Sequence, residues 1–367
     1  MPATMTKRER VQRTLECRET DRVPLYDLLR NDEAFEVLGG EPLGPLAPDE
    51  RTVKRLNRIV GRAVAAWLDM TRSVGFGPVE EADTTDEFGF VHHSSPFQKT
   101  TWIVRRPFDD EAGAVEFLQQ WIARAHADRK AIQADPTAYR QAYHRGFLQT
   151  QSLIGDTVNL LAQHGVGLDG VRHRLGLELF SYLCADEGGL VSEALEATTA
   201  RNVAECHAVA DAALSPAVLT YGDIACKGRL LHSPAYLRAE FFPRLKRLND
   251  AWHEHGLSCL FHSDGYLMEV MDDLIASDID GLNPIETLAG MSLGEVRRHC
   301  GGQLVLAGGI DMSQLLSLGT PEEVREVCRQ AVRDAGPGYF MGSTTEADNS
   351  CKLENLLAMR EVALEAI

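Results

Sequence analysis

Side chains able to do acid–base or metal chemistry follow three short apolar runs between residues 257 and 311. His262 and Asp264 follow the first run, Glu286 follows the second, and Asp311 follows the third. An imidazole and carboxylates can exchange protons with a substrate or bind a divalent cation. If the three runs are neighbouring strands, these groups would meet at one site.

The apolar runs alternate with two amphipathic stretches, Tyr266–Ala276 and Met291–Cys300, which have the periodicity of helices. This alternation is typical of βα units, whose parallel strands are buried on both faces and therefore read as continuous apolar runs. In such sheets the functional groups gather at the carboxyl ends of the strands. His262 and Asp264 stand two residues apart in an extended segment, so their side chains point to the same side.

We predict an α/β fold, a single (β/α)8 TIM barrel spanning residues 1–367, with helices and a β-hairpin elaborating residues 1–110. The hairpin, Phe88–His92 with Thr100–Val104, lies outside the βα pattern and would serve as a lid or a subunit contact. Other expected helices are Thr6–Cys17 with a capping box, Asp49–Leu68, two within 109–147, 189–213, Ala235–His255, Pro321–Asp334 and Lys352–Glu365; other expected strands are Val158–Leu161, Gly165–Val171, Ala217–Tyr221 and Gly338–Met341.

Composition excludes several classes of partner. The net charge of -17 argues against a surface for nucleic acid or an anionic membrane, since either needs clustered Lys and Arg. Apolar stretches such as Ala63–Leu68 fall far short of the roughly 18 to 20 residues that span a bilayer, so we expect a cytoplasmic protein. The eight cysteines form no CxxC pair and therefore indicate neither a zinc ribbon nor a disulfide framework.

A series of short motifs runs through most of the chain, and their order and spacing are more specific than any one of them. They are DRVP at 21–24, DEFG at 86–89, YGD at 221–223 before SP at 233–234, FHSDG at 261–265, LNPIE at 282–286, GGID at 308–311 before GTPEEV at 319–324, and LENLLAM at 353–359. This order resembles the uroporphyrinogen decarboxylase superfamily, which includes corrinoid-dependent methyltransferases. The resemblance implies a TIM barrel and a homodimer.

Two departures separate the chain from the decarboxylases that it resembles. Those enzymes grip their tetrapyrrole with an arginine-rich stretch after the first strand, where this chain reads Leu28–Glu33 with Arg30 alone among two acids. Losing bidentate arginine contacts is not repaired by one cation. The decarboxylases also carry a His in the loop before the last helix, whereas the loop here, Gly342–Glu346, has none.

The methyltransferase branch, by the same resemblance, binds zinc through a His-x-Cys pair and a later Cys. This chain keeps His262 but has Asp264 in place of the first Cys, and Thr345 or Glu346 where the second would lie. His262, Asp264 and Glu346 would form a harder zinc site that suits an oxygen ligand. A metal there could act as a Lewis acid on a methyl ether or another oxygenated methyl donor.

The leading hypothesis is therefore a methyltransferase that moves a methyl group between a small donor and a corrinoid (cobalamin) carried on a partner protein. Asp223, Asp264 and Glu286 would be catalytic, while Arg30, Lys227 and Asp311 would bind the substrate; Asp311 is equally expected as the N-cap of a helix beginning at Met312. A second hypothesis is a decarboxylase in which Asp223 or Asp264 protonates a carbanion. A third is a non-catalytic corrinoid or tetrapyrrole binder, because fold alone does not fix activity.

Overall fold

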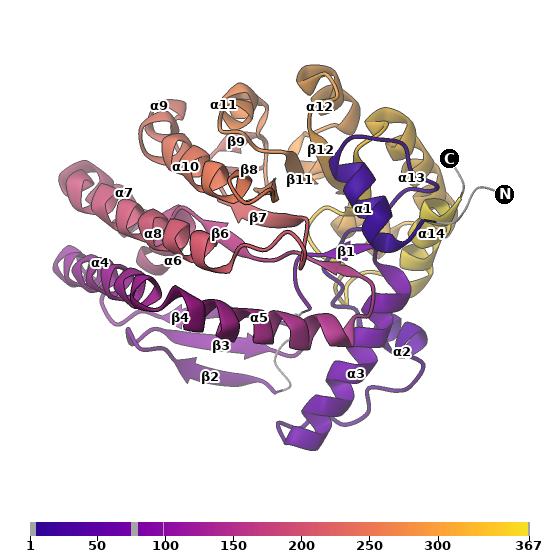
Figure 1. The fold of residues 1–367 in the computed structure, drawn as a ribbon, viewed down its shortest axis with the longest axis horizontal. Coiled ribbons are helices and arrows are strands. Elements are labelled where there is room, and N and C mark those ends of the chain that lie inside the picture. Colours follow the sequence, from indigo (N-terminus) through magenta and orange to yellow (C-terminus); the bar gives the residue numbers. More distant parts are fainter. Residues whose placement is uncertain (1–4, 75–79, 98, 366–367) are drawn as a thin grey trace.

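The computed structural model describes residues 5–74, 80–97 and 99–365. Its centre is a six-stranded parallel sheet (Figure 1) in which each strand is buried along most of its length. The strand order is β13 (Tyr339–Ser343), β12 (Val305–Ile310), β11 (Gly281–Ile285), β10 (Ser258–His262), β7 (Ala217–Tyr221) and β6 (Gln163–Gly165).

Shorter segments close this sheet into a ring. Next to β13, Tyr26 donates its backbone N–H to Met341 O (3.0 Å). On its other side the same segment bridges Met70, the first residue of β1 (Met70–Thr71). The first barrel strand is thus reduced to a pair of bridging residues.

The last link passes through β5 (Val158–Asn159), which pairs in parallel with β1. The chain runs from β5 directly into β6, and between the two Leu161 donates to Ala217 O of β7 (3.0 Å). Eight parallel segments therefore form a continuous hydrogen-bonded circuit, as a TIM barrel requires.

Side chains from these segments fill the barrel interior, as expected for a packed eight-stranded barrel. Tyr26 and Phe340 meet edge to face, with ring centroids 6.1 Å apart. Val11 of α1 (Lys7–Leu15) belongs to the same buried cluster, so the N-terminal helix closes one end of the barrel. The other members are Met70, Val158, Leu160, Ala217, Leu219, Leu260, Val305 and Ala307.

Helices surround the barrel, the nearest of them packing on the outer surface of the strands and others packing on those helices (Figure 1). They are α2 (Asp32–Gly39), α3 (Glu50–Trp67), α4 (Glu111–Ala134), α5 (Pro136–Leu153), α6 (Leu168–Leu175), α7 (Leu177–Asp186), α8 (Gly188–Val209), α9 (Pro234–Tyr236), η1 (Leu237–Phe241), α10 (Phe242–His253), η2 (Met268–Val270), α11 (Met271–Ala276), η3 (Thr287–Ala289), α12 (Leu293–Cys300), η4 (Met312–Leu316), α13 (Pro321–Ala335) and α14 (Leu353–Leu364). In the described part of the chain, none is long and apolar enough to cross a membrane.

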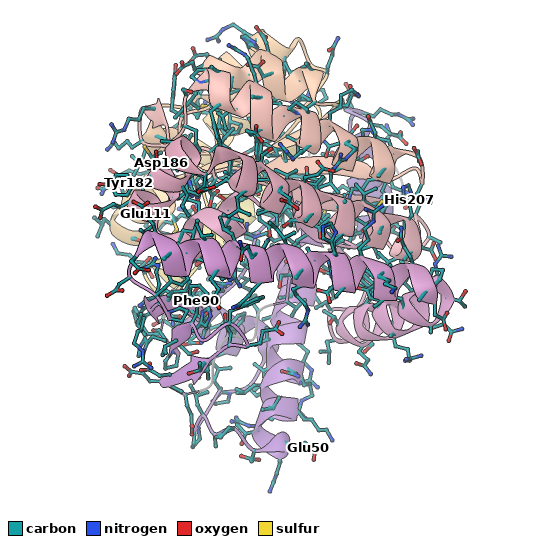
Figure 2. All side chains as sticks on the ribbon, turned by 90° about the vertical axis from the view of Figure 1, so that its left-hand side faces the viewer. Glu50, Phe90, Glu111, Tyr182, Asp186 and His207 are labelled. Atoms are coloured by element: carbon teal, nitrogen blue, oxygen red, sulfur yellow. The ribbon has the colours of Figure 1, made fainter. Side chains whose placement is uncertain are left out.

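A separate antiparallel sheet of β2 (Ala82–Thr85), β3 (Val91–Ser95) and β4 (Thr100–Arg105) lies outside the barrel. It packs on α4 through aromatic residues: Phe90 meets Phe117 of α4 with ring centroids 5.2 Å apart (Figure 2). The predicted hairpin is confirmed, but its first strand is Val91–Ser95, shifted from the predicted Phe88–His92.

Some of the other predicted elements are confirmed, and one is wrong over part of its length. The capping box at Thr6, the long helix α3 and strand β7 are confirmed. The strand predicted over Gly165–Val171 is wrong after Gly165, because Gly167 adopts a φ of 90° that ends the extended segment, and α6 begins at Leu168. A short hairpin, β8 (Ala225–Cys226) with β9 (Arg229–Leu230), was not predicted.

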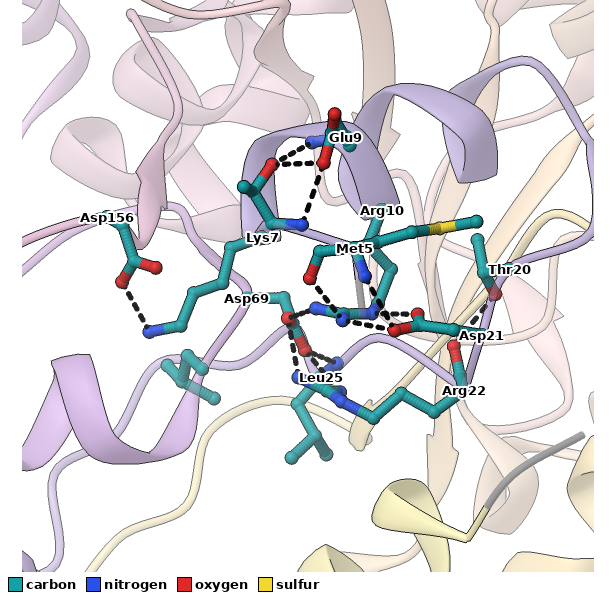
Figure 3. A network of polar contacts seen from close by, with 12 residues as sticks. Met5, Lys7, Glu9, Arg10, Thr20, Asp21, Arg22, Leu25, Asp69 and Asp156 are labelled. Atoms are coloured by element: carbon teal, nitrogen blue, oxygen red, sulfur yellow. Dashed lines mark hydrogen bonds and ion pairs between the residues drawn. The ribbon is translucent and has the colours of Figure 1, made fainter. Parts of the chain in front are cut away.

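A network of buried charges ties the N-terminal segment to the amino end of the barrel (Figure 3). Asp69, which precedes β1, has no solvent exposure and pairs with Arg10 (2.7 Å) and Arg22 (2.8 Å). It also accepts from the backbone N–H of Leu25 (2.9 Å). Arg10 in turn pairs with Asp21 (2.7 Å), so each charge of this network has an opposite partner.

Candidate functional site

The polar residues expected to form the site lie at the carboxyl end of the barrel. Asp223 comes two residues after β7, His262 is the last residue of β10, and Glu286 directly follows β11. Parallel pairing aligns His262 with Tyr221 on one side and with Asn283 on the other. This register sets the three strand ends level, so the residues that follow them face one another.

Asp223, His262 and Asp264 form the centre of the site. One potential ligand atom from each residue lies within 4.8 Å of the other two, and all three side chains are partly buried. The backbone N–H of Asp264 donates to Asp223 Oδ1 (3.3 Å), which fixes one carboxylate relative to the other. An imidazole nitrogen and two carboxylate oxygens at this separation can share one cation or one proton.

The imidazole of His262 is held in one orientation. Its Nδ1 lies 3.0 Å from Asn283 Oδ1, which can only accept a hydrogen bond, so the ring proton belongs on Nδ1. Burial, together with the nearby charge of Arg72, lowers the pKa of His262 to about 4. The ring is therefore neutral at pH 7, and its Nε2 lone pair can bind a cation or accept a hydrogen bond.

Asp264 has an unusual electrostatic environment. Burial raises its pKa to about 7, and the neighbouring carboxylates of Asp223 and Glu286 contribute in the same direction. Its Oδ1 is buried and has no hydrogen-bond partner among the described residues. A buried acceptor without a partner is costly, so this oxygen points to a group that the chain itself does not supply.

Arg72 is the cation at the site. Its guanidinium lies 3.3 Å from His262 Nδ1 and 3.5 Å from Nε2, and it donates to Thr345 O (3.3 Å). Its charge opposes the rise in the pKa of Asp264. Arg72 follows β1, on the far side of the barrel mouth from β10, so the site spans the barrel opening.

Glu286 and Asp169 support the central residues. Glu286 Oε2 accepts from the backbone N–H of Gly265 (2.6 Å), which fixes the turn after Asp264. Asp169, at the start of α6, accepts from the backbone N–H of Asp223 (2.7 Å) and pairs with Arg172 (2.8 Å). Burial and the charge of Asp223 raise the pKa of Asp169 to about 6.

With this geometry in hand, comparisons with known proteins identify the family. Residues 179–366, half of the chain, match the family described as uroporphyrinogen decarboxylase (URO-D). The chain belongs to the uroporphyrinogen decarboxylase family. Among solved structures, a methyltransferase from Methanosarcina mazei aligns over 98% of both chains with a TM-score of 0.67 and 15% sequence identity. At that identity the likeness concerns the fold, and the comparison with curated proteins found no match.

In this member of the uroporphyrinogen decarboxylase family, two of the predicted site residues bind each other. Arg30 and Glu346 form an ion pair with an N–O distance of 3.0 Å. Glu346 is not part of the ligand cluster at His262, where Asp223 takes the place we had predicted for it. Arg30, which we predicted to bind substrate, pairs with Glu346 in the structure.

Two further predicted residues lie outside the central cluster. Asp311 accepts hydrogen bonds from the backbone N–H groups of Ser313, Gln314 and Leu315, so its carboxylate is used as the N-cap of η4. Lys227 is exposed at the turn of the β8–β9 hairpin. Of the two roles predicted for Asp311, the structure therefore shows the helix N-cap.

Three members of the site were not predicted: Arg72, Asn283 and Asp169. Asn283 belongs to the LNPIE motif, and its position opposite His262 could have been inferred from the register of two strands that end in polar residues. Arg72 follows a strand of two residues, too short to give an apolar run. Nothing in the sequence around Asp169 distinguishes it from a helix-capping acid.

The residues present would bind a divalent metal through oxygen and nitrogen ligands, and they provide no sulfur ligand. Asp223, His262 and Asp264 supply two hard oxygens and one imidazole nitrogen, Asn283 orients the imidazole, and the unpartnered Asp264 Oδ1 offers a ligand. The carboxylates also offset the positive charge of Arg72. Two other clusters in the described residues lie at the opposite end of the barrel. Cys206 and His207 of α8, which precedes β7, lie with His255 before β10, and His253 and Cys259 at the start of β10 lie with Asp280 before β11.

Proposed function

We propose that the protein is a corrinoid-dependent methyltransferase that takes a methyl group from an oxygen of a small donor. The observation that carries this proposal is the cluster of Asp223, His262 and Asp264 at the barrel mouth, with their ligand atoms within 4.8 Å of one another. Family membership and a methyltransferase of the same fold support an enzyme of this type. The donor, the metal and the corrinoid protein are parts of the proposal.

In this proposal Asp223, His262 and Asp264 hold one divalent cation, zinc being the expected metal. When bound, the cation supplies Lewis acidity to the donor oxygen. Asn283 keeps the Nε2 of His262 available by accepting a hydrogen bond from Nδ1–H. Glu286 holds the backbone at Gly265, which keeps Asp264 turned toward the site. A homodimer and a corrinoid carried on a partner protein remain expectations from the family.

Arg72 has a separate role in this proposal. Transfer of the methyl group breaks its bond to the donor oxygen, which keeps the electron pair and becomes negatively charged. A guanidinium at the barrel mouth, next to His262 and Thr345 O, can stabilise that developing charge. A reduced corrinoid, when bound, would supply the electron pair that accepts the methyl group.

The test is an assay of methyl transfer from a methyl ether to free cob(I)alamin, in which the absorbance of methylcobalamin measures the rate. We expect His262→Ala and Asp264→Asn to lower the rate at least about 100-fold, a loss typical of removing a metal ligand or a catalytic group. Glu50→Gln, an exposed change at the far end of α3, should leave it unchanged (Figure 2). Equal activity in all three variants would contradict the proposed site.

One observation favours the decarboxylase as a second candidate. Asp264, with a pKa of about 7, holds a proton for part of the time at neutral pH and could deliver it to a carbanion. Arg72 would then bind the substrate carboxylate. Release of carbon dioxide from a carboxylated pyrrole by the metal-free protein would favour this reading over methyl transfer.

A further inference from the structure

A cavity of about 360 Å³ lies beside the barrel mouth, enclosed by α4, α6, α8 and the ends of β6 and β7. Its volume is in the range of small-molecule binding pockets. Aromatic rings from three separate segments line it: Phe88, Trp121 and Tyr221. Such walls suit a flat, apolar ligand.

Arg174 of α6 is a cation in this cavity that forms no ion pair with the described residues, although the charge of Asp86 is close enough to act on its pKa. Its guanidinium carbon lies 4.8 Å from the Trp121 ring centroid, and in the described residues its side chain has one hydrogen bond, a 3.5 Å contact to Gly170 O. Its Nε is buried without a partner. Burial lowers the pKa of Arg174, the direction expected for a cation removed from water.

The other arginines of the cavity are already neutralised. Arg124 pairs with Asp128 (2.9 Å) and with Glu87, and Arg201 pairs with Glu205. The carboxylate of Asp169 also has partners, because it pairs with Arg172 and accepts a hydrogen bond from the backbone N–H of Asp223. Among the described residues that line the cavity, Arg174 is therefore the arginine that is not in an ion pair.

We propose that this cavity binds a planar aromatic carboxylate, with its carboxylate on the free N–H groups of Arg174 and its ring among Trp121, Phe88 and Tyr221. A carboxylate would satisfy the guanidinium through charge-assisted hydrogen bonds, which a neutral or cationic ligand cannot do. Arg174 is already held against Trp121, so little side-chain freedom is lost on binding.

Two residues that line the cavity, Asp169 and Tyr221, connect it to the candidate site. Asp169 lines the cavity and accepts from the backbone of Asp223, and Tyr221 stands two residues before Asp223. A ligand in the cavity therefore borders the segment that carries Asp223. That the bound acid is the methyl donor, as an aromatic methyl ether, rests on the proposed function.

The first test uses the unmodified protein and a matched pair of probes, benzoate and benzamide, which share their shape but differ in charge. In calorimetric titrations we expect benzoate to bind about 10- to 100-fold more tightly, the effect of one charged hydrogen-bonding anchor. Equal affinities, or no binding of benzoate, would overturn the inference without relying on any variant.

The second test assigns the anchor. Arg174→Met should remove the preference for benzoate, whereas Arg124→Met, a matched change in the same cavity whose charge is already paired, should alter it less than about 3-fold. Equal losses in both variants would show general attraction and overturn the role of Arg174. Preferential benzoate binding without methyl transfer from 4-methoxybenzoate would uphold the cavity and count against the proposed function.

Discussion

Asp69 at the amino end of the barrel is a fully buried carboxylate and Asp264 at the carboxyl end is a partly buried one, and their surroundings differ. Asp69 pairs with two arginines and a backbone N–H. Asp264 lies among the carboxylates of Asp223 and Glu286 and leaves one oxygen without a partner among the described residues. The first arrangement stabilises the fold. In the second, the carboxylates repel one another, and a bound cation would relieve that repulsion.

The largest effect on stability is expected at the amino end. Asp69→Ala leaves Arg10 and Arg22 without their shared carboxylate, and Arg10 is almost fully buried. Removing one partner of a buried ion pair typically costs about 3–5 kcal/mol of the free energy of unfolding. Urea unfolding would measure this, with Glu50→Gln in the exposed pair with Lys54 as a control that should change stability by less than about 0.5 kcal/mol.

The opposite sign is expected at the carboxyl end. Asp264→Asn removes a charge that the folded protein holds poorly, so at pH 8 and without added metal we expect a gain of about 1–3 kcal/mol. The folded pKa of about 7 lies above the unfolded value, so the wild-type protein loses stability as pH rises between about 4 and 7. The advantage of the variant should therefore shrink toward pH 4. A variant less stable than wild type at pH 8 would show that Asp264 is compensated after all.

A smaller effect with the reverse pH dependence is expected for Asp21→Asn. Hydrogen bonds from Arg10 and from the backbone of Met5 hold the pKa of Asp21 below its usual value, despite the opposing effect of burial. Its contribution is present above the unfolded pKa and is lost as pH falls through the folded pKa. Unfolding should show a loss of about 1 kcal/mol at pH 7 that disappears in acid. A loss that persists at low pH would mean that packing, and not charge, is responsible.

The smallest effect is expected for Glu346→Gln. Because Glu346 pairs with Arg30 and lies outside the ligand cluster, metal affinity should change by less than about 3-fold. Zinc competition with a chromogenic chelator would measure this beside Asp264→Asn. If both variants lost affinity equally, Glu346 would be a ligand, as the sequence had led us to expect.

The sequence reveals those parts of the barrel that consist of full apolar strands. β7, β10, β11 and β12 were recognisable, and the polar residues that follow them lie at one end of the barrel as predicted. The first strand was expected before Leu28, where Leu25 and Tyr26 lie, but β1 has two residues and is too short to give a periodic signal, so Arg72 was missed. The pairing of Arg30 with Glu346 joins residues 316 positions apart and depends on closure of the ring, which local patterns do not report.

The central claim is that the carboxyl end of the barrel holds a cation between Asp223, His262 and Asp264. Anomalous diffraction at the zinc edge, from crystals of the wild-type protein equilibrated with zinc, tests it most directly. The account predicts one strong peak among these three side chains that is lost in His262→Ala. A wild-type crystal with no peak there, or with zinc bound only at Cys206, His207 and His255, would contradict it.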